Sequence, residues 1–474
     1  MHSFAMTQDI AFRYTRSDQA ASHYHYVPFE VPEGTTRIEI AIDYVRREGI
    51  CSLDFGLIDG TATDFPSTSG LIGWTGSARL EFFTALDDAT PGYLYGAIVP
   101  GTWKVLIGLS DMPEEGVDGI VHIRLDSTPR TVKAQPKPTA PVRQGAGWYR
   151  GDLHCHTFHS DADGAPETLH AQAKQAGLDF LAVADHNTIT QRQYFYPASS
   201  PDLVFVRGTE VSTFAGHANA FGVTGMVDYR LTKPEHALML SDHVHALGGI
   251  LSLNHDKPTI PWRWELPRID CMEVWQSTWI EWNWISLARY QARLAAGLRI
   301  SAIGGSDYHQ PVDLKPESPF VLARPTTVLW LEELSEAAII RAIKAGHGYI
   351  TEDPQGPHLS ITAEGLPMGS LLPRANEVTA TVRGAPGDRL VWIDASGEID
   401  SAIIEGDEWT ATLPSPERTT TFIRAEIVAE ASYERQYAIA EAALPEAPEV
   451  DRLIPIMRAQ TIRRAISNPI YFGR

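Results

Sequence analysis

Cysteine is scarce in this sequence, which holds only Cys51, Cys155 and Cys271 among 474 residues. Three widely separated cysteines cannot form the paired framework of a small secreted domain, and none lies in a CxxC metal motif. The N-terminus also lacks a basic segment followed by an apolar stretch, which is the pattern of a secretory signal peptide. These absences favour a reducing compartment, and we expect a cytoplasmic location.

Positive charge is in deficit as well, since 39 Lys and Arg face 59 Asp and Glu and give a formal net charge of −20 at pH 7. Such a surface repels nucleic-acid phosphates and anionic membranes, and no apolar run reaches the length of a membrane span. The P-loop, the dinucleotide fingerprint and the nucleophile elbow are absent too. We therefore expect a small-molecule substrate, and neither a nucleic-acid polymer nor a membrane as partner.

The patterns that are present divide the chain into three folded regions and a linker. Period-two alternation, as in residues 36–44, predicts strands across residues 1–126, which we assign to an N-terminal β-sandwich. Such a module binds sugars or partners, or only covers the catalytic unit. Residues 127–147 form a proline-rich linker that should be extended. Strand patterns return over residues 356–474 and predict a second, small β-sandwich whose final segment docks back onto the protein.

Strands alternate with helices over residues 148–355, which predicts a parallel α/β core of barrel type. Pro166 and Gly177 mark the ends of one helix, and further helices are expected over residues 235–247 and 331–345. A cluster of polar residues follows several of the strands. Because such folds place their active sites at the C-terminal ends of strands, we expect these clusters to meet.

The polar clusters hold the residue types that bind transition metals. His154 and His156 alternate on one predicted strand, so both imidazoles point to the same side. Neutral imidazoles and carboxylates suit Zn, Mn or Fe(II). Two or three divalent ions, with water completing each coordination sphere, need about as many ligands as the clusters offer. The predicted ligands are His154, His156, Asp161, His186, Glu210, His255, Asp307 and His309.

Such a centre predicts a metallohydrolase. Clustered ions lower the pKa of a bound water into the neutral range, and the resulting hydroxide attacks an electrophilic centre. Glu210 is assigned a catalytic role because its two oxygens can bridge two ions, and Asp185 is assigned to the catalytic machinery as a carboxylate that orients a ligand imidazole. A structural zinc site, the non-enzymatic alternative, needs only four ligands. We therefore predict an enzyme.

In order and content, these motifs resemble those of the PHP (polymerase and histidinol phosphatase) superfamily. The resemblance covers residues 148 to about 355 and lies in the segments Asp152-Leu153-His154-Cys155-His156-Thr157, Ser160-Asp161, Ala184-Asp185-His186-Asn187, Gly208-Thr209-Glu210, Asn254-His255 and Gly305-Ser306-Asp307-Tyr308-His309. It implies a distorted seven-stranded β/α barrel with up to three Zn, Mn or Fe ions, and hydrolysis of phosphomonoesters or phosphodiesters. It further implies one ion on His154, His156, Glu210 and Asp307, a second on Glu210 and His255, and a third on Asp161, His186 and His309.

One position departs from the family pattern. Many PHP proteins carry a ligand histidine where this chain has Asn219, and a histidine stands instead at His217. The run Gly216-His217-Ala218-Asn219-Ala220-Phe221-Gly222 resembles the CehA/McbA-like branch, which includes carbaryl hydrolase. The resemblance implies either a less firmly held second ion or a role for His217 as ligand, catalytic residue or substrate contact. It also adds an alternative reaction at the same metal site, the hydrolysis of carboxyl esters, carbamates or amides.

Further residues are assigned to the substrate. Lys257 and Arg192 are predicted to neutralise a phosphate, and His347, between two glycines, to contact substrate; the alternative for each is a surface or structural residue. Six tryptophans predict a pocket for an aromatic or nucleoside-like group, or else ordinary packing of a long loop: Trp262, Trp264, Trp275, Trp279, Trp282 and Trp284. The sequence leaves open the substrate, the native metal and whether the chain forms a homo-oligomer.

Overall fold

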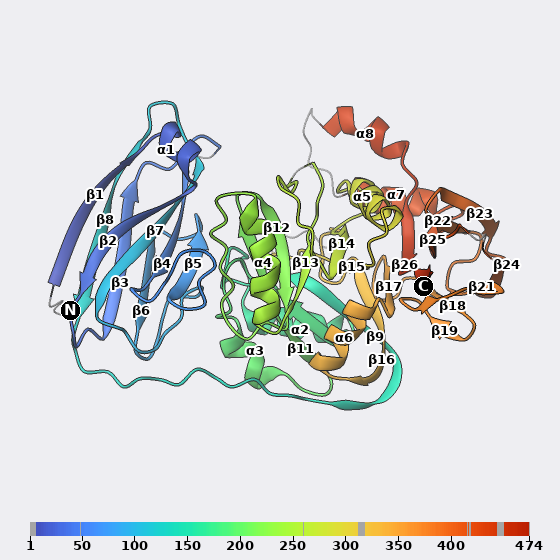
Figure 1. Ribbon diagram of the computed structural model, residues 1–474, viewed down its shortest axis with the longest axis horizontal. Coiled ribbons are helices and arrows are strands. Elements are labelled where there is room, and N and C mark those ends of the chain that lie inside the picture. The colour runs from blue at the N-terminus through green and yellow to red at the C-terminus, as the bar shows by residue number, and fades with distance from the viewer. Residues whose placement is uncertain are drawn as a thin grey trace.

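The computed structural model describes residues 6–47, 49–258, 260–310, 318–414, 416, 419–442 and 450–473. The protein has a mixed α/β fold, as expected, with a β unit at each end of its long axis and an α/β unit between them (Figure 1). Within these described ranges, no helix combines the length and the apolar character required to cross a bilayer.

The N-terminal unit consists of two four-stranded antiparallel sheets and one short helix, α1 (Arg16–Ala21). Strands of both sheets contribute to one buried core, in which Ile38, Leu53 and Trp103 are almost fully buried. Alternate residues of β3 face this core, as the period-two pattern predicts. One sheet has the order β1 (Met6–Tyr14), β8 (Val117–Asp126), β3 (Arg37–Tyr44), β6 (Glu81–Ala85); the other has the order β2 (Tyr24–Val31), β7 (Gly101–Asp111), β4 (Ser52–Ile58), β5 (Leu71–Gly76).

The linker runs along one side of the molecule from the N-terminal to the central unit (Figure 1). It has no helix or strand over residues 127–142 and is tied to both units, because Lys133 N donates to Leu86 O and Thr139 Oγ1 donates to Tyr196 O. The next strand begins at Arg143, so the last residues of the predicted linker belong to the sheet.

The central unit is built on seven consecutive strands that are neighbours in one sheet. Strands β9, β10 and β11 are parallel, as are β13, β14 and β15, but β12 is antiparallel to both of its neighbours. The expectation of a parallel core is therefore wrong at β12. These strands are β9 (Arg143–Cys155), β10 (Phe180–Val183), β11 (Val204–Thr213), β12 (Gly216–Phe221), β13 (Ile250–Leu253), β14 (Cys271–Gln276) and β15 (Ser301–Gly305).

The two ends of this seven-strand set approach each other. Just beyond the end of β15, Asp307 N donates to His154 O at 2.7 Å, and His156 N donates to Tyr308 O at 2.9 Å. The direction of β12 matters at this point, because an antiparallel strand starts at the end of the sheet where its parallel neighbours finish. The first residues of β12 therefore lie with the C-terminal ends of the other six strands.

Helices and two further strands complete the central unit. Helices α2 and α4 confirm the predictions from Pro166, Gly177 and residues 235–247, and Gly177 adopts the left-handed φ of 73° that ends a helix. The helix predicted over residues 331–345 begins only at Glu336, because residues up to Leu334 pair with β9. These elements are α2 (Pro166–Gln175), α3 (Arg192–Ala198), α4 (Glu235–Ala246), α5 (Asn283–Ala295), β16 (Thr326–Leu334), α6 (Glu336–Ala345) and β17 (Gly348–Thr351).

The C-terminal unit is continuous with the central sheet. β26 pairs with β17, so the tail docks back onto the protein as predicted. The unit is not purely β, because it also contains α7 and α8. Its elements are β18 (His358–Ala363), β19 (Leu366–Pro367), β20 (Leu371–Leu372), β21 (Glu377–Arg383), β22 (Arg389–Asp394), β23 (Gly397–Ile403), β24 (Glu408–Pro414), β25 (Phe422–Val428), α7 (Tyr433–Glu441), α8 (Val450–Arg458), β26 (Arg463–Ser467) and β27 (Ile470–Phe472).

Candidate metal centre

The eight predicted ligands lie at one end of the central strands. His154, near the end of β9, and Glu210, within β11, are on the strands themselves. The other six follow the ends of β9, β10, β13 and β15. Two ligand positions, His255 and Asp307, have left-handed backbone conformations, with φ of 21° and 53°. Non-glycine residues adopt this conformation at a cost of about 1–3 kcal/mol, and such strain is concentrated at functional sites.

One largely buried group of ligand atoms consists of His154, His156, Glu210 and Asp307, whose nitrogen and oxygen atoms lie within 4.8 Å of one another. His154 Nε2 lies 3.4 Å from Glu210 Oε2 and 3.2 Å from Asp307 Oδ1. His156 Nε2 lies 2.9 Å from the same Asp307 oxygen. This is the set that the PHP resemblance implies for one ion.

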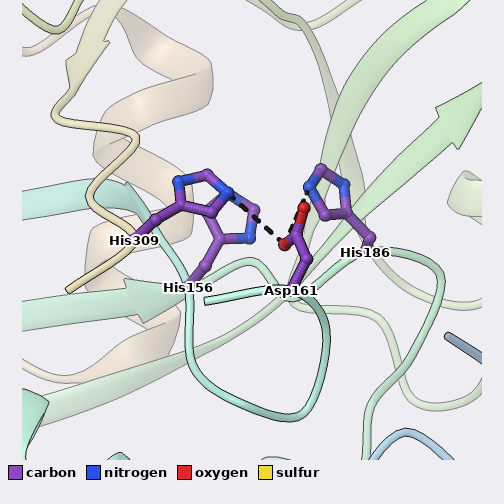
Figure 2. Close-up of side chains that lie close together, drawn as sticks. All are labelled: His156, Asp161, His186 and His309. Carbon is purple, nitrogen blue, oxygen red and sulfur yellow. Dashed lines mark ion pairs between the residues drawn. The ribbon is translucent and has the colours of Figure 1, made fainter. Parts of the chain in front are cut away.

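A second group combines His156, Asp161, His186 and His309, again with ligand atoms within 4.8 Å of one another. Figure 2 shows the Asp161 carboxylate between the rings of His186 and His309, and Oδ1 lies 3.4 Å from Nε2 of each. The Asp161 side chain is 48% exposed, whereas that of His154 is fully buried. The centre therefore opens to solvent on the side of Asp161.

His217 and His255 meet on the remaining oxygen of Glu210. His217 Nδ1 lies 3.3 Å and His255 Nε2 lies 3.1 Å from Oε1. His217 reaches this position because it lies near the start of the antiparallel strand β12. Asn219 lies opposite Glu210 in the β11–β12 ladder, and its side-chain amide donates to Leu153 O at 3.3 Å. The imidazole of His217 is the histidine of this strand that reaches Glu210.

Glu273, on β14, is not among the predicted ligands, but its carboxylate lies within 4.8 Å of ligand atoms of His154 and His255. A charged residue in the middle of an apolar strand was the available signal. Gln276 was not predicted either, and its Nε2 donates to Asp307 Oδ2 at 2.8 Å. Lys257 donates to the Gln276 side-chain oxygen. The ammonium group of Lys257 is thereby held next to the centre, and burial lowers its pKa to about 8.

Asp185 is fully buried but is not placed as we expected. Its carboxylate accepts hydrogen bonds from Thr157 N at 2.8 Å, from Thr157 Oγ1 at 2.8 Å and from Ser160 Oγ at 2.7 Å. These donors belong to the loop after β9, and none is a ligand imidazole. Asp185 therefore fixes the loop that carries Asp161 instead of orienting a ring.

Two residues assigned to the substrate have neighbours other than the candidate ligands. Arg192 is buried on α3, and the charged groups that act on it, Arg207 and Glu336, are not candidate ligands. His347 directly precedes β17, where Gly348 lies opposite Leu329, and Leu329 lies opposite Tyr149. Tyr149 precedes His156 by seven residues, which is roughly 20 Å of strand. The prediction for His347 was wrong because its strand places it far along β9 from the ligands. Arg192 forms no hydrogen bond or ion pair with a candidate ligand in the described part of the chain, and its assignment stays a prediction.

The six clustered tryptophans do not form one pocket lining. Trp275 and Trp279 are buried in the main core and contact each other edge to face, with ring centroids 4.9 Å apart. Trp262 lies nearer to the centre, because its Nε1 donates to His217 O at 2.6 Å. Packing thus accounts for the first two side chains, and Trp262 supports the backbone of a residue beside Glu210.

Burial and neighbouring charges shift the pKa values of the side chains in this centre. Burial alone would lower the pKa of His186, but Asp161 and Glu210 raise it to about 10. Burial would raise the pKa of Glu210, but the imidazoles of His154 and His186 bring it well below its usual value. Burial lowers the pKa of His156 to about 3, so this ring is neutral. Ionised carboxylates beside imidazoles are the state in which a divalent cation binds and displaces protons.

Two buried ligand atoms that lack hydrogen-bond partners also fit a metal centre. His154 Nε2 and Glu210 Oε2 are both buried and have no hydrogen-bond partner, although they lie 3.4 Å apart. Buried polar atoms without partners are costly, and a shared cation would satisfy both. The donor set of imidazole nitrogen and carboxylate oxygen suits Zn, Mn or Fe.

Comparison with known proteins identifies the domain that carries this centre. Residues 152–306 match the model of the PHP domain, which confirms that part of the resemblance seen in the sequence. The match includes six of the eight predicted ligands and reaches Ser306, directly before Asp307, so Asp307 and His309 lie beyond it. No curated protein matches the chain.

Two solved structures are similar to the chain. One, from Bacteroides vulgatus ATCC 8482, is described as a two-domain protein containing a predicted PHP-like metal-dependent phosphoesterase; it is 15% identical, with a TM-score of 0.34, and the alignment covers 62% of this chain and 94% of that chain. The other, from Bifidobacterium adolescentis ATCC 15703, is described as a metal-dependent phosphoesterase; it is 18% identical, with a TM-score of 0.27, and the alignment covers 38% and 93% of the two chains.

Proposed function

We propose that this protein is a metal-dependent phosphoesterase that hydrolyses phosphomonoesters or phosphodiesters of a small molecule at a centre of two or three Mn, Zn or Fe ions. One observation carries the proposal: the two oxygens of Glu210 lie within 3.7 Å of five imidazole nitrogens, those of His154, His156, His186, His217 and His255. A buried carboxylate so surrounded suits a bridging ligand between ions.

We further propose that β9 to β15 form the distorted seven-stranded barrel implied by the PHP resemblance, between two β-sandwiches. The contact between the ends of β9 and β15 supports this closure. The position of His217 beside Glu210 supports assignment to the CehA/McbA-like branch.

The proposed ligand sets follow from the groups of side chains. His154, His156, Glu210 and Asp307 would hold one ion. Asp161, His186 and His309, which form a second group with His156, would hold another. Glu210 with His217 and His255 would serve a further ion. When bound, such ions activate water and stabilise the charge that develops on a phosphoryl oxygen.

The protein's own residues supply orientation and charge. Asp185 holds the loop that carries Asp161. Lys257, held by Gln276 beside Asp307, offers a buried ammonium group to a phosphoryl oxygen. A carbonyl oxygen bears less negative charge than a phosphoryl oxygen, so this ammonium group favours the phosphoester over the carbonyl-ester, carbamate or amide alternative.

The experiment compares the steady-state turnover of nitrophenyl phosphate, bis-nitrophenyl phosphate and a nitrophenyl carboxyl ester or carbamate by Mn-reconstituted protein. We expect phosphoester turnover that His156→Ala abolishes. His347→Ala is the matched control, because it removes an imidazole outside the centre. Turnover of the carbonyl esters alone would replace the phosphoesterase with the alternative hydrolase. Less than one tightly bound metal ion per chain would contradict both.

A further inference from the structure

The N-terminal β unit contacts the loop that carries Asp161. Arg79, in the turn between β5 and β6, donates hydrogen bonds to two backbone carbonyls of this loop, Phe158 O and Ser160 O, the latter from Nη1 at 3.0 Å. The Ser160 carbonyl belongs to the peptide group that joins Ser160 to Asp161. A side chain of the N-terminal unit therefore holds the backbone directly before a candidate metal ligand.

The Asp161 loop depends on such support. Asp161 has the most exposed side chain of the eight predicted ligands, at 48%, and its loop extends beyond the end of β9. Asp185, which belongs to the central unit, fixes this loop by accepting hydrogen bonds from Thr157 N and from the Ser160 hydroxyl. Arg79 holds other atoms of the same loop, because it donates to carbonyl oxygens whereas Asp185 accepts from N–H and O–H groups. The two charged side chains together leave the loop little freedom to move Asp161.

A second contact from the N-terminal unit reaches the loop after His186. Gly92 N donates to Thr190 Oγ1 at 3.0 Å, and Gly92 O accepts from Thr188 Oγ1 at 3.1 Å. Thr190 Oγ1 also lies 2.8 Å from Nδ1 of His159, which belongs to the loop that Arg79 holds. The loops of two ligands in the same four-residue group thus rest on the N-terminal unit.

The guanidinium group suits this task. It is a rigid planar fork that can hold two acceptors in fixed geometry, which an ammonium group cannot do. Arg79 forms no ion pair with any residue in the described part of the chain, so its donors are directed to backbone oxygens. Burial lowers the pKa of Arg79, and the charges of Asp185 and Asp161 counteract this effect. Its positive charge thus lies near the Asp161 carboxylate without binding it.

We propose that Arg79 is a positioning residue for the ion of the group His156, Asp161, His186 and His309, so that the N-terminal unit sets the affinity of this ion. The neighbouring group around His154 and Glu210 lies deeper in the central unit and does not contact Arg79. The proposal rests on the proposed function, because it requires that ions bind both groups. Removal of an outer-shell partner typically weakens metal binding about 10- to 100-fold.

The test measures bound metal rather than turnover. Full-length wild type, Arg79→Ala, Asp161→Asn and the double variant are stripped with a chelator and titrated with Mn²⁺, and each bound equivalent is counted by equilibrium dialysis with metal analysis. We expect Arg79→Ala to weaken one equivalent about 10- to 100-fold and to leave the others unchanged. Asp161→Asn should weaken the same equivalent, and the double variant should bind no more weakly than Asp161→Asn.

Two further variants separate positioning from folding. Arg46→Ala is the matched control, because Arg46 Nη1 donates to a carbonyl of its own unit, Ser77 O, at 2.9 Å; it should bind all equivalents like wild type. Arg79→Lys keeps the charge but cannot span both carbonyls, and it should bind the affected equivalent with intermediate affinity. Guanidinium ion added at low, non-denaturing concentration should restore the lost affinity of Arg79→Ala and not that of Asp161→Asn.

The outcomes distinguish the role of Arg79 from the existence of the metal centre. Unchanged binding of every equivalent in Arg79→Ala, or equal weakening of all of them, would overturn the role of Arg79 while leaving the metal centre intact. If Asp161→Asn also bound every equivalent like wild type, the Asp161 group would hold no ion. That result would overturn the proposal through the proposed centre itself.

Discussion

Nδ1 of His154 lies 2.8 Å from Oε1 of Glu273, so the ring directs its other nitrogen toward Glu210. The second oxygen of Glu273 accepts from the backbone N of His255 at 3.1 Å. One buried carboxylate therefore fixes the ring of one candidate ligand and the backbone of another. Carboxylates that bind the outer nitrogen of a ligand histidine fix its tautomer and raise its basicity.

Glu273→Gln tests this relationship, since glutamine keeps the size of the side chain and loses its negative charge. We expect Mn²⁺ binding to weaken by about 10- to 100-fold, with a parallel loss of kcat/KM at limiting metal. Titration of the stripped protein measures the effect. The exposed residue Glu398, which pairs with Arg389, provides the control Glu398→Gln. Wild-type metal affinity in Glu273→Gln would exclude a role for this carboxylate in the centre.

Lys257→Met tests which ester the centre favours. The ammonium group is held by Gln276 beside Asp307, and a phosphoryl oxygen would receive a charge-assisted hydrogen bond from it. Such a bond contributes about 1.5–3 kcal/mol, so kcat/KM for nitrophenyl phosphate should fall about 10- to 100-fold. Turnover of a carboxyl ester should change far less. Lys344→Met, at an exposed position, is the control; equal losses for both ester types would contradict the assignment.

His347→Ala should leave turnover and metal binding within about twofold of wild type. The residue precedes β17, in register with a part of β9 roughly 20 Å from the ligands. Steady-state kinetics and a thermal melt together check this expectation, because any change should come through stability. A selective loss of kcat at unchanged stability would show that His347 does contact the substrate.

The clustering of the candidate ligand side chains could be predicted from the sequence because its signal is local. An apolar run followed by His or Asp identifies a strand end, and strand ends in one α/β unit lie together whatever the details of packing. His154 and His186 could therefore be assigned to one site before their distances were known. The same logic failed for His347, because a glycine-flanked histidine does not reveal the direction of the strand that follows it.

Other features depend on contacts that no local pattern encodes. Glu273 is a ligand partner only because β14 turns it toward His154 and His255, and an isolated charge on an apolar strand does not show its direction. Arg79 precedes Ser160 by about eighty residues, and their hydrogen bond exists only because two units pack together. The β11–β12 hairpin explains why His217 reaches Glu210, since an antiparallel strand returns its first residues to the same end.

A buried ion cluster in the C-terminal unit provides a test of stability. Glu426 on β25 is fully buried and accepts hydrogen bonds from Arg424 and Arg463. Burial would raise the pKa of Glu426, but the charges of Arg463 and Arg424 lower it from 4.5 to about 2. The folded state therefore holds this carboxylate ionised at a pH where the unfolded chain would protonate it.

Because the folded-state pKa is depressed, the contribution of Glu426 is fully present above pH 4.5 and is lost as pH falls toward 2. A shift of this size corresponds to about 3 kcal/mol. Glu426→Gln should destabilise the protein by about 3–5 kcal/mol at pH 7, because the buried Arg424 and the partly buried Arg463 lose their charged partner. Urea unfolding at pH 7, 5 and 3.5 should show the difference from wild type constant between the first two and smaller at the third. The exposed variant Glu398→Gln should differ little from wild type throughout, and a difference for Glu426→Gln that stays constant down to pH 3.5 would contradict the depressed pKa.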